Sequence, residues 1–210
     1  MAPIKKNPIL ILSTVLWLLV VSIGLGAVWD YSLSAGVAGT PPNRWPVASS
    51  IRPRADGFTL VVVAHPHCPC SRATIGELAG LLARANGRVT GYVLFVQPAG
   101  FTEDWVKTDL WRSAAAIPGV TAIRDERGTE ARRFGAETSG QTMLYDPSGL
   151  LLFSGGITAA RGHFGDNAGS GAVASFIASG AGSRSDTSVF GCPLFDPSSQ
   201  CSKGKGPCKG

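Results

Sequence analysis

The sequence predicts an α/β domain that follows a single membrane-spanning segment. Two observations predict this organisation. An uncharged apolar run near the N-terminus has the length of a membrane helix, and short apolar stretches then alternate with helical patterns. The chain has 210 residues, 44% of them hydrophobic, which leaves enough for one domain of ordinary size after the N-terminal segment and a C-terminal tail are set aside.

Residues 1–29 are predicted to form a membrane anchor. Lys5 and Lys6 precede an uncharged run from Ile9 to Val28, which at ~1.5 Å per helical residue covers the ~30 Å of a hydrocarbon core. Leu25-Gly26-Ala27 offers the alternative of a cleaved signal peptide, although the run is longer than the usual apolar core of such peptides. The two lysines orient the N-terminus toward the cytoplasm, so the rest of the chain is expected outside it.

Residues 30–56, rich in Ser, Ala, Gly and Pro, are expected to be a spacer that holds the domain off the membrane. The domain itself is assigned to residues 57–180. Its first buried strand is predicted at 58–64, a helix ending at Asn86-Gly87 at 71–85, and a second buried strand at 89–96.

The second half of the domain continues the alternation. A helix is predicted at 103–116, a short strand at 120–124 and a short helix at 128–134. Two further strands, 142–145 and 150–154, flank the strong turn signal Asp146-Pro147-Ser148-Gly149, and a last helix covers 171–179. A strand–helix–strand unit, a further helix and a hairpin closed by a helix is the element order of the thioredoxin fold, which has a central mixed sheet flanked by helices.

The remaining residues, 181–210, form a Gly- and Ser-rich tail that contains cysteines and one apolar patch, 189–195. The formal net charge of the chain is +5, and its basic residues form no long run. This charge is too small and too scattered to predict a nucleic-acid partner.

The chemistry of the chain is concentrated in His65-Pro66-His67-Cys68-Pro69-Cys70-Ser71, between the first predicted strand and the first helix of the domain. Unpaired backbone N–H groups and the helix dipole at this position favour a thiolate over a thiol. Such a loop is suited either to disulfide exchange or to binding a soft metal ion.

From residue 58 to 179 the chain resembles the membrane-anchored, thioredoxin-like TlpA-type proteins of bacterial envelopes, whose first strand ends in Trp-Cys-x-x-Cys-Arg-Ala. Cys68 falls on the first cysteine of that motif, and Ser71 replaces the second cysteine. Arg72-Ala73 matches the Arg-Ala of the motif, and Glu77-Leu78 matches a Glu-Leu pair that the family carries in the next helix.

The loop that carries a cis-proline in this family is similar to Ser139-Gly140-Gln141, before the strand at 142–145, and Gly140 stands in the place of the proline. Together with Arg161-Gly162-His163 and Phe190-Gly191-Cys192, the pattern resembles the RedB-type group most. The resemblance implies a thiol–disulfide oxidoreductase that requires no cofactor and acts on thiols or disulfides of envelope proteins. It also implies a single-pass protein of a bacterial-type inner membrane with a periplasmic domain.

Cys68 is the predicted nucleophile, but the residue that resolves its mixed disulfide is left open. Cys70 is nearest in the sequence, yet residues two apart point away from each other in a regular helix, so a Cys68–Cys70 bridge needs an extended or turned loop. Cys192, in the apolar patch, is the alternative resolving thiol. Cys201 and Cys208 flank a short loop in the tail, and the odd number of five cysteines leaves at least one unpaired.

A different class of function remains open beside the first. His65, His67, Cys68 and Cys70, with His163 as a further candidate, are ligand types that suit Cu⁺ or Zn²⁺. Gly140, lacking the bulk of a proline, would leave room above Cys68 for a metal ion or a third thiol. The alternative function is therefore a non-enzymatic metal-binding protein or metallochaperone.

Overall fold

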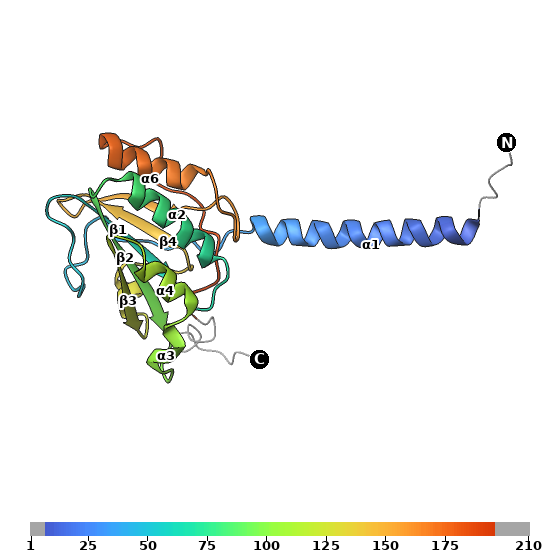
Figure 1. Cartoon of the computed structure of the whole chain (residues 1–210), viewed down its shortest axis with the longest axis horizontal. Helices are drawn as coiled ribbons and strands as arrows, with labels where there is room; N and C mark the ends of the chain where they lie inside the picture. Colours follow the sequence, from blue (N-terminus) through green and yellow to red (C-terminus); the bar gives the residue numbers. More distant parts are fainter. Residues whose placement is uncertain (1–6, 196–210) are drawn as a thin grey trace, which may run out of the picture.

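The computed structural model describes residues 7–195. It begins with helix α1, Pro8–Leu33, which projects away from a folded domain (Figure 1). The helix is N-capped by Asn7, whose side chain accepts a hydrogen bond from the Ile9 N–H at 3.2 Å. Among the described residues it is the one helix long and apolar enough to cross a membrane, with a mean hydropathy of 2.5 and no residue buried against the domain.

The domain is built on a five-stranded mixed sheet with the order β3-β2-β1-β4-β5. The strands β1 (Phe58–Ala64), β2 (Val89–Gln97) and β3 (Val120–Glu126) are parallel to one another. The strands β4 (Gln141–Tyr145) and β5 (Leu151–Gly156) form an antiparallel hairpin, and β4 runs antiparallel to β1. This is the thioredoxin-like sheet that the order of elements predicts.

The helices of the domain are α2 (Ser71–Arg84), α3 (Glu103–Val106), α4 (Asp109–Ala115), α5 (Thr129–Arg133) and α6 (Ala168–Ser179). The single helix predicted over 103–116 is therefore two helices. Thr108 interrupts it because its extended backbone and its side chain, which accepts from the Trp111 N–H, form an N-cap for α4. The last helix starts earlier than predicted because Asn167 caps it by accepting from the Ser170 N–H at 2.8 Å.

The sheet is buried on both faces, and successive residues of β1 contribute to opposite cores. Leu60 and Val62 pack in one core with side chains of α2, α4 and α6. Val61 and Val63 pack in the other with residues of α5, with Ile51 and with Leu194. The second core therefore depends on segments outside the regular elements.

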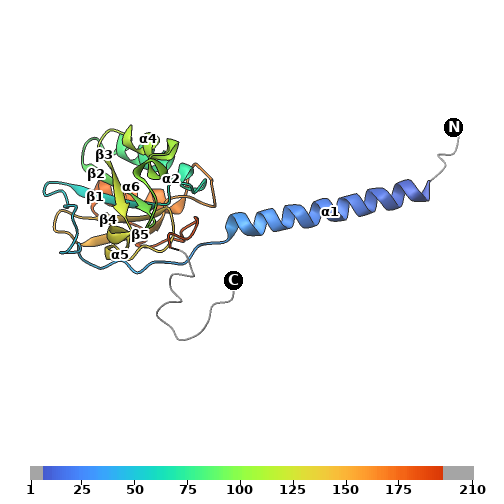
Figure 2. The same ribbon diagram turned by 90° about the horizontal axis from the view of Figure 1, so that it is seen from below.

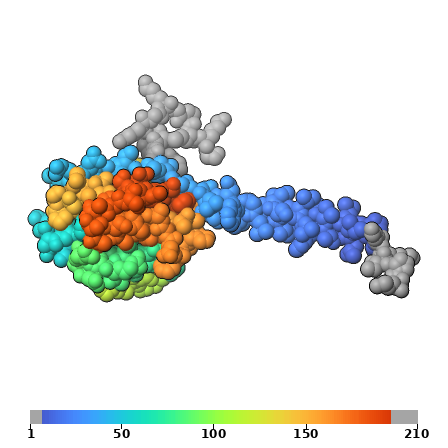
Figure 3. Space-filling model, turned by 90° about the horizontal axis from the view of Figure 1, so that it is seen from above, coloured from blue at the N-terminus to red at the C-terminus, as the bar shows by residue number. Residues whose placement is uncertain are grey.

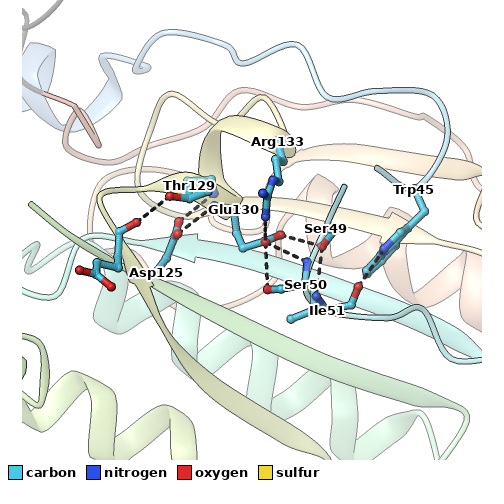
Figure 4. A network of polar contacts seen from close by, with 10 residues as sticks. Trp45, Ser49, Ser50, Ile51, Asp125, Thr129, Glu130 and Arg133 are labelled. Atoms are coloured by element: carbon cyan, nitrogen blue, oxygen red, sulfur yellow. Dashed lines mark hydrogen bonds and ion pairs between the residues drawn. The ribbon is translucent and has the colours of Figure 1, made fainter. Parts of the chain in front are cut away.

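The segment between α1 and β1 is not the free spacer that its composition predicts, since it covers the second face of the sheet and runs along the domain beside α5 (Figure 2). Glu130, on α5, fastens this segment (Figure 4): its carboxylate accepts from Ser49 Oγ at 2.6 Å and from the Ser50 N–H at 2.9 Å, and it pairs with Arg133. The apolar Ile51 follows directly and enters the core. Burial of this face explains why a Pro-rich segment packs on the domain instead of extending into solvent.

The C-terminal segment up to Phe195 also packs on the domain, where it forms part of its surface (red in Figure 3). The Ser154 N–H donates to Ser185 O at 2.9 Å, and the Leu194 N–H donates to Glu137 O, also at 2.9 Å. Cys192 lies in this segment, beside the loop that precedes β4, where the Ser139 N–H donates to Cys192 O. Cys201 and Cys208 lie outside the described residues.

Candidate functional site

Cys68 lies in a tight turn between β1 and α2. The Cys68 N–H donates to His65 O at 3.0 Å, and the Ser71 N–H donates to Cys68 O at 3.1 Å, so the loop closes on itself before the helix begins. Pro66 and Pro69 favour such a turn because their rings fix φ. Only 3% of Cys68 and 7% of Cys70 is exposed, and both are free thiols.

Cys192 is the partner that the structure places against Cys68, with their Sγ atoms 3.0 Å apart. The segment that carries Cys192 is held beside the loop before β4, because the Ser139 N–H donates to Cys192 O at 2.8 Å. A disulfide needs ~2.05 Å between sulfurs, so a movement of about an ångström separates this dithiol from a covalent bond.

Two buried serines, Ser71 and Ser139, hydrogen-bond at the base of the turn and hold it in place. Ser71 Oγ and Ser139 Oγ share a hydrogen bond of 2.6 Å, and Ser139 Oγ also accepts from the His65 N–H at 2.8 Å. Ser71 takes the position where the resembling family has its second cysteine. It therefore links the helix start to the loop before β4 without offering a thiol.

The three thiols differ in acidity. Burial acts to raise the pKa of Cys68, but hydrogen bonds from Cys192 and Ser71 outweigh it, so the pKa of Cys68 lies below its ordinary value. Burial, together with the neighbouring Cys68, raises the pKa of Cys192 to about 12. Burial and the charge of Cys68 likewise raise the pKa of Cys70. Cys68 is thus the thiol most readily ionised, and once it is ionised Cys192 is placed to donate a hydrogen bond to it.

The rings of the two histidines of the loop pack against Trp105 of α3. Their ring centroids lie 5.5 Å (His65) and 4.5 Å (His67) from that of Trp105. His67 Nε2 is 2.9 Å from Trp105 O, and the His67 N–H donates to His65 Nδ1 at 3.2 Å. Burial, and then the proximity of His67, lowers the pKa of His65, which favours the neutral form of that ring.

The predicted metal site is not formed in the part of the chain that the structure describes. Residues 7–195 contain no group of three or more His, Cys, Asp or Glu side chains placed to hold a metal ion. The reason is geometric: the rings of His65 and His67 turn to Trp105, while Cys68 turns to Cys192. His163, the further candidate ligand, is exposed in the loop after β5.

Gly140 occupies a backbone conformation that suits glycine, with φ +94°. Its N–H donates to Val63 O at 2.7 Å, and a Cβ built there would lie 3.0 Å from Thr74 Oγ1 on α2. The structure therefore gives Gly140 a backbone role: a side chain at this position would point at α2. The described residues contain no cis peptide bond.

Arg161 belongs to the site but was not among the residues predicted to act there. Its Nη1 donates to Gly191 O at 2.6 Å, next to Cys192, and its charge acts to lower the pKa of both Cys70 and Cys192. The sequence signals for it are its place in the Arg161-Gly162-His163 stretch of the family resemblance and its positive charge in the Gly-rich segment after the hairpin. Nothing in those signals specifies which loop the guanidinium contacts.

This sheet, with a cysteine turn leading into α2 and the glycine loop before β4, gives the domain a thioredoxin-like fold. It is similar to the solved structure of a hypothetical protein from Sinorhizobium meliloti 1021, with 18% identity, a TM-score of 0.56, and coverage of 77% of this chain and 95% of that one. It is similar also to an uncharacterized conserved protein from Geobacillus kaustophilus, with 15% identity, a TM-score of 0.55, and coverage of 79% and 94%. At these identities the likeness shows the fold alone.

A secreted disulfide oxidoreductase of Mycobacterium tuberculosis matches with 17% identity, a TM-score of 0.32, and coverage of 46% of this chain and 66% of that one. No protein-family model matches the chain. No curated protein matches it either. The case for an activity therefore depends on the site itself.

Proposed function

We propose that this protein is a membrane-anchored thiol–disulfide oxidoreductase in which Cys68 is the nucleophile and Cys192 the resolving thiol. The observation that carries the proposal is the 3.0 Å contact between the two Sγ atoms, combined with a lowered pKa at Cys68 and a raised pKa at Cys192. A thiolate hydrogen-bonded by a second thiol, at the start of a helix, is the arrangement that disulfide exchange requires.

The exchange would proceed in two steps. The Cys68 thiolate attacks one sulfur of a partner disulfide, which forms a mixed disulfide and releases one partner thiolate. Cys192, after losing its proton, then attacks Cys68 Sγ, which forms the Cys68–Cys192 disulfide and releases the second partner thiolate. Two electrons pass to the partner, and the reverse sequence oxidises a partner dithiol.

Cys192 is favoured over Cys70 as the resolving thiol because it already contacts the nucleophile. Cys70 has helical φ and ψ of −64° and −29° at the cap of α2, and residues two apart in a helical backbone point away from each other. The charge of Cys70 acts to raise the pKa of Cys192, so the three thiols influence one another.

Helix α1 supports the anchored part of the proposal. Its length and hydropathy suit a membrane span, and the domain contacts only its C-terminal end. The lysines before it favour a domain outside the cytoplasm, where disulfides persist and protein thiols are natural partners.

The experiment that tests the proposal is disulfide mapping of the full chain in detergent after equilibration with glutathione buffers. The oxidised protein should yield a peptide pair joined through Cys68 and Cys192. Cys192→Ser should trap the mixed disulfide on Cys68, whereas the matched change Cys70→Ser should leave turnover within about twofold. A Cys68–Cys70 bridge, or turnover that survives Cys192→Ser, would contradict the assignment.

A further inference from the structure

Arg161 contacts the end of the anchor helix through three groups. Its backbone N–H donates to Ser32 O at 3.0 Å, and its Nε donates to Ser34 O at 3.1 Å. Its guanidinium also lies over the ring of Tyr31, 4.9 Å from the centroid. The last carbonyls of a helix lack internal partners and carry the negative end of its dipole, so a cation is well placed there.

The same side chain reaches the redox site. Its Nη1 donates to Gly191 O at 2.6 Å, which constrains the residue immediately before Cys192. The chain that follows α1 meets this segment again, because the Gly36 N–H donates to Val189 O at 2.8 Å. The end of α1, the loop after β5 and the C-terminal segment therefore come together at one side of the domain (Figure 1).

We propose that Arg161 is a positioning residue that holds Cys192 beside Cys68 and is itself held by the end of the anchor helix, so that resolution of the mixed disulfide depends on residues Tyr31 to Ser34. This inference rests on the proposed redox role of Cys68 and Cys192. It adds that the end of the anchor helix contributes to resolution of the mixed disulfide, besides attaching the domain to the membrane.

Electrostatics supports the same arrangement. The guanidinium acts to lower the pKa of Cys192, against burial and the neighbouring Cys68, which raise it. The attacking form of Cys192 is its thiolate, so a cation nearby helps the second step. Lysine would keep the charge, but it lacks the planar fork through which Nε and Nη1 of Arg161 reach Ser34 O and Gly191 O.

The test uses full-length protein in detergent, in a background where Cys70, Cys201 and Cys208 are serine, with dithiobis(nitrobenzoate) as the oxidant. Attack by Cys68 releases one coloured thiolate and leaves the other half on Cys68. Attack by Cys192 on Cys68 Sγ then releases the second. The two releases report the nucleophilic step and the resolving step separately.

Arg161→Gln should slow the second release by about tenfold or more, as expected for loss of a charged hydrogen bond, while the first release stays within about twofold. Arg161→Lys should recover the pH profile of the second release but only part of its rate. Arg84→Gln, on an exposed residue at the far end of α2, is the matched control and should change neither release.

Tyr31→Leu extends the test to the anchor. It should slow the second release, whereas Tyr31→Phe, which keeps the ring, should not. The effect of Tyr31→Leu should disappear in the Arg161→Gln background, because both changes act through one guanidinium. These variants lie outside the hydrophobic cores, so far-UV circular dichroism should remain that of the parent.

The outcomes separate the two proposals. If the parent protein gives no second release, the redox assignment of Cys192 fails. If the parent gives both releases and Arg161→Gln leaves the second unchanged, the assignment stands and the positioning role of Arg161 is wrong. Additive effects of Tyr31→Leu and Arg161→Gln would overturn the dependence on the anchor helix.

Discussion

Cys68 Sγ lies 3.0 Å from Cys192 Sγ although the two residues are 124 positions apart in the chain. The contact joins the turn before α2 to the C-terminal segment that packs beside the loop before β4. The pKa of one thiol is lowered and that of the other is raised. The two thiols are therefore unequal in acidity, and Cys68 is the more readily ionised of the two.

The first prediction concerns the acidity of Cys68. With Cys70, Cys201 and Cys208 as serine, Cys192→Ser should keep an O–H donor toward the Cys68 thiolate, whereas Cys192→Ala should lose it. Alkylation of Cys68 by iodoacetamide, followed against pH, should therefore reach half its maximum at a higher pH in the alanine variant. Identical profiles would mean that the side chain of Cys192 does not stabilise the thiolate.

The second prediction concerns Gly140. Gly140→Ala should destabilise the protein by about 1–3 kcal/mol, because an L-residue is strained at φ +94° and its Cβ would lie 3.0 Å from Thr74 Oγ1. Gly140→Pro should be worse, since proline fixes φ near −65° and removes the N–H that donates to Val63 O. Urea unfolding measures both effects.

A double variant separates the two causes of strain at Gly140. Thr74→Ala removes the side-chain contact but leaves the backbone conformation, so it should relieve only part of the cost of Gly140→Ala. Full recovery of stability would show that space alone, and not the positive φ, requires glycine here.

The third prediction concerns the hydrogen bonds between Glu130 and the segment after α1. Burial acts to raise the pKa of Glu130, but hydrogen bonds from Ser49, Ser50 and Arg133 outweigh the effect of burial. The pKa of Glu130 therefore lies below its ordinary value. Glu130→Gln should cost about 1–2 kcal/mol at neutral pH, the usual range for weakening hydrogen bonds to a charged group.

The sign of its pH dependence follows from that lowered pKa. Its stabilising contribution is complete above the unfolded-state pKa of ~4.3 and is lost as the pH falls through the lower folded-state value. The difference between wild type and Glu130→Gln in urea unfolding should therefore shrink below about pH 4. A difference that stays constant down to pH 2 would contradict a role for the ionised carboxylate.

The fourth prediction concerns topology. A reporter that is active only outside the cytoplasm, fused after Gly210, should be active, because two lysines precede an uncharged helix of spanning length. The protein should remain with the membrane fraction at full mass. A shortened soluble form that begins after Ala27 would instead identify the N-terminal segment as a cleaved signal.

Local patterns in the sequence were sufficient for the order of the strands and helices. The apolar run of β1, the turn signal at residues 146–149 and the Asn86-Gly87 stop signal after α2 act within a few residues, so they can be interpreted without knowing the fold. The same holds for Cys68, whose place between a buried strand and a helix start already predicts a reactive thiol. The helix break at Thr108 was missed because a threonine cap competes with an apolar pattern that continues through it.

The sequence by itself therefore determined the thioredoxin-like order of elements, the apolar N-terminal helix and the position of Cys68 in the loop between β1 and α2. Only the tertiary structure decided which groups surround that thiol. Cys192 and Arg161 arrive from distant loops, and the rings of His65 and His67 turn to Trp105 and away from a shared metal site. The positions of these side chains depend on which segments cover the second face of the sheet and on which donors reach the unpaired carbonyls. Such long-range packing leaves no periodic signal in the sequence.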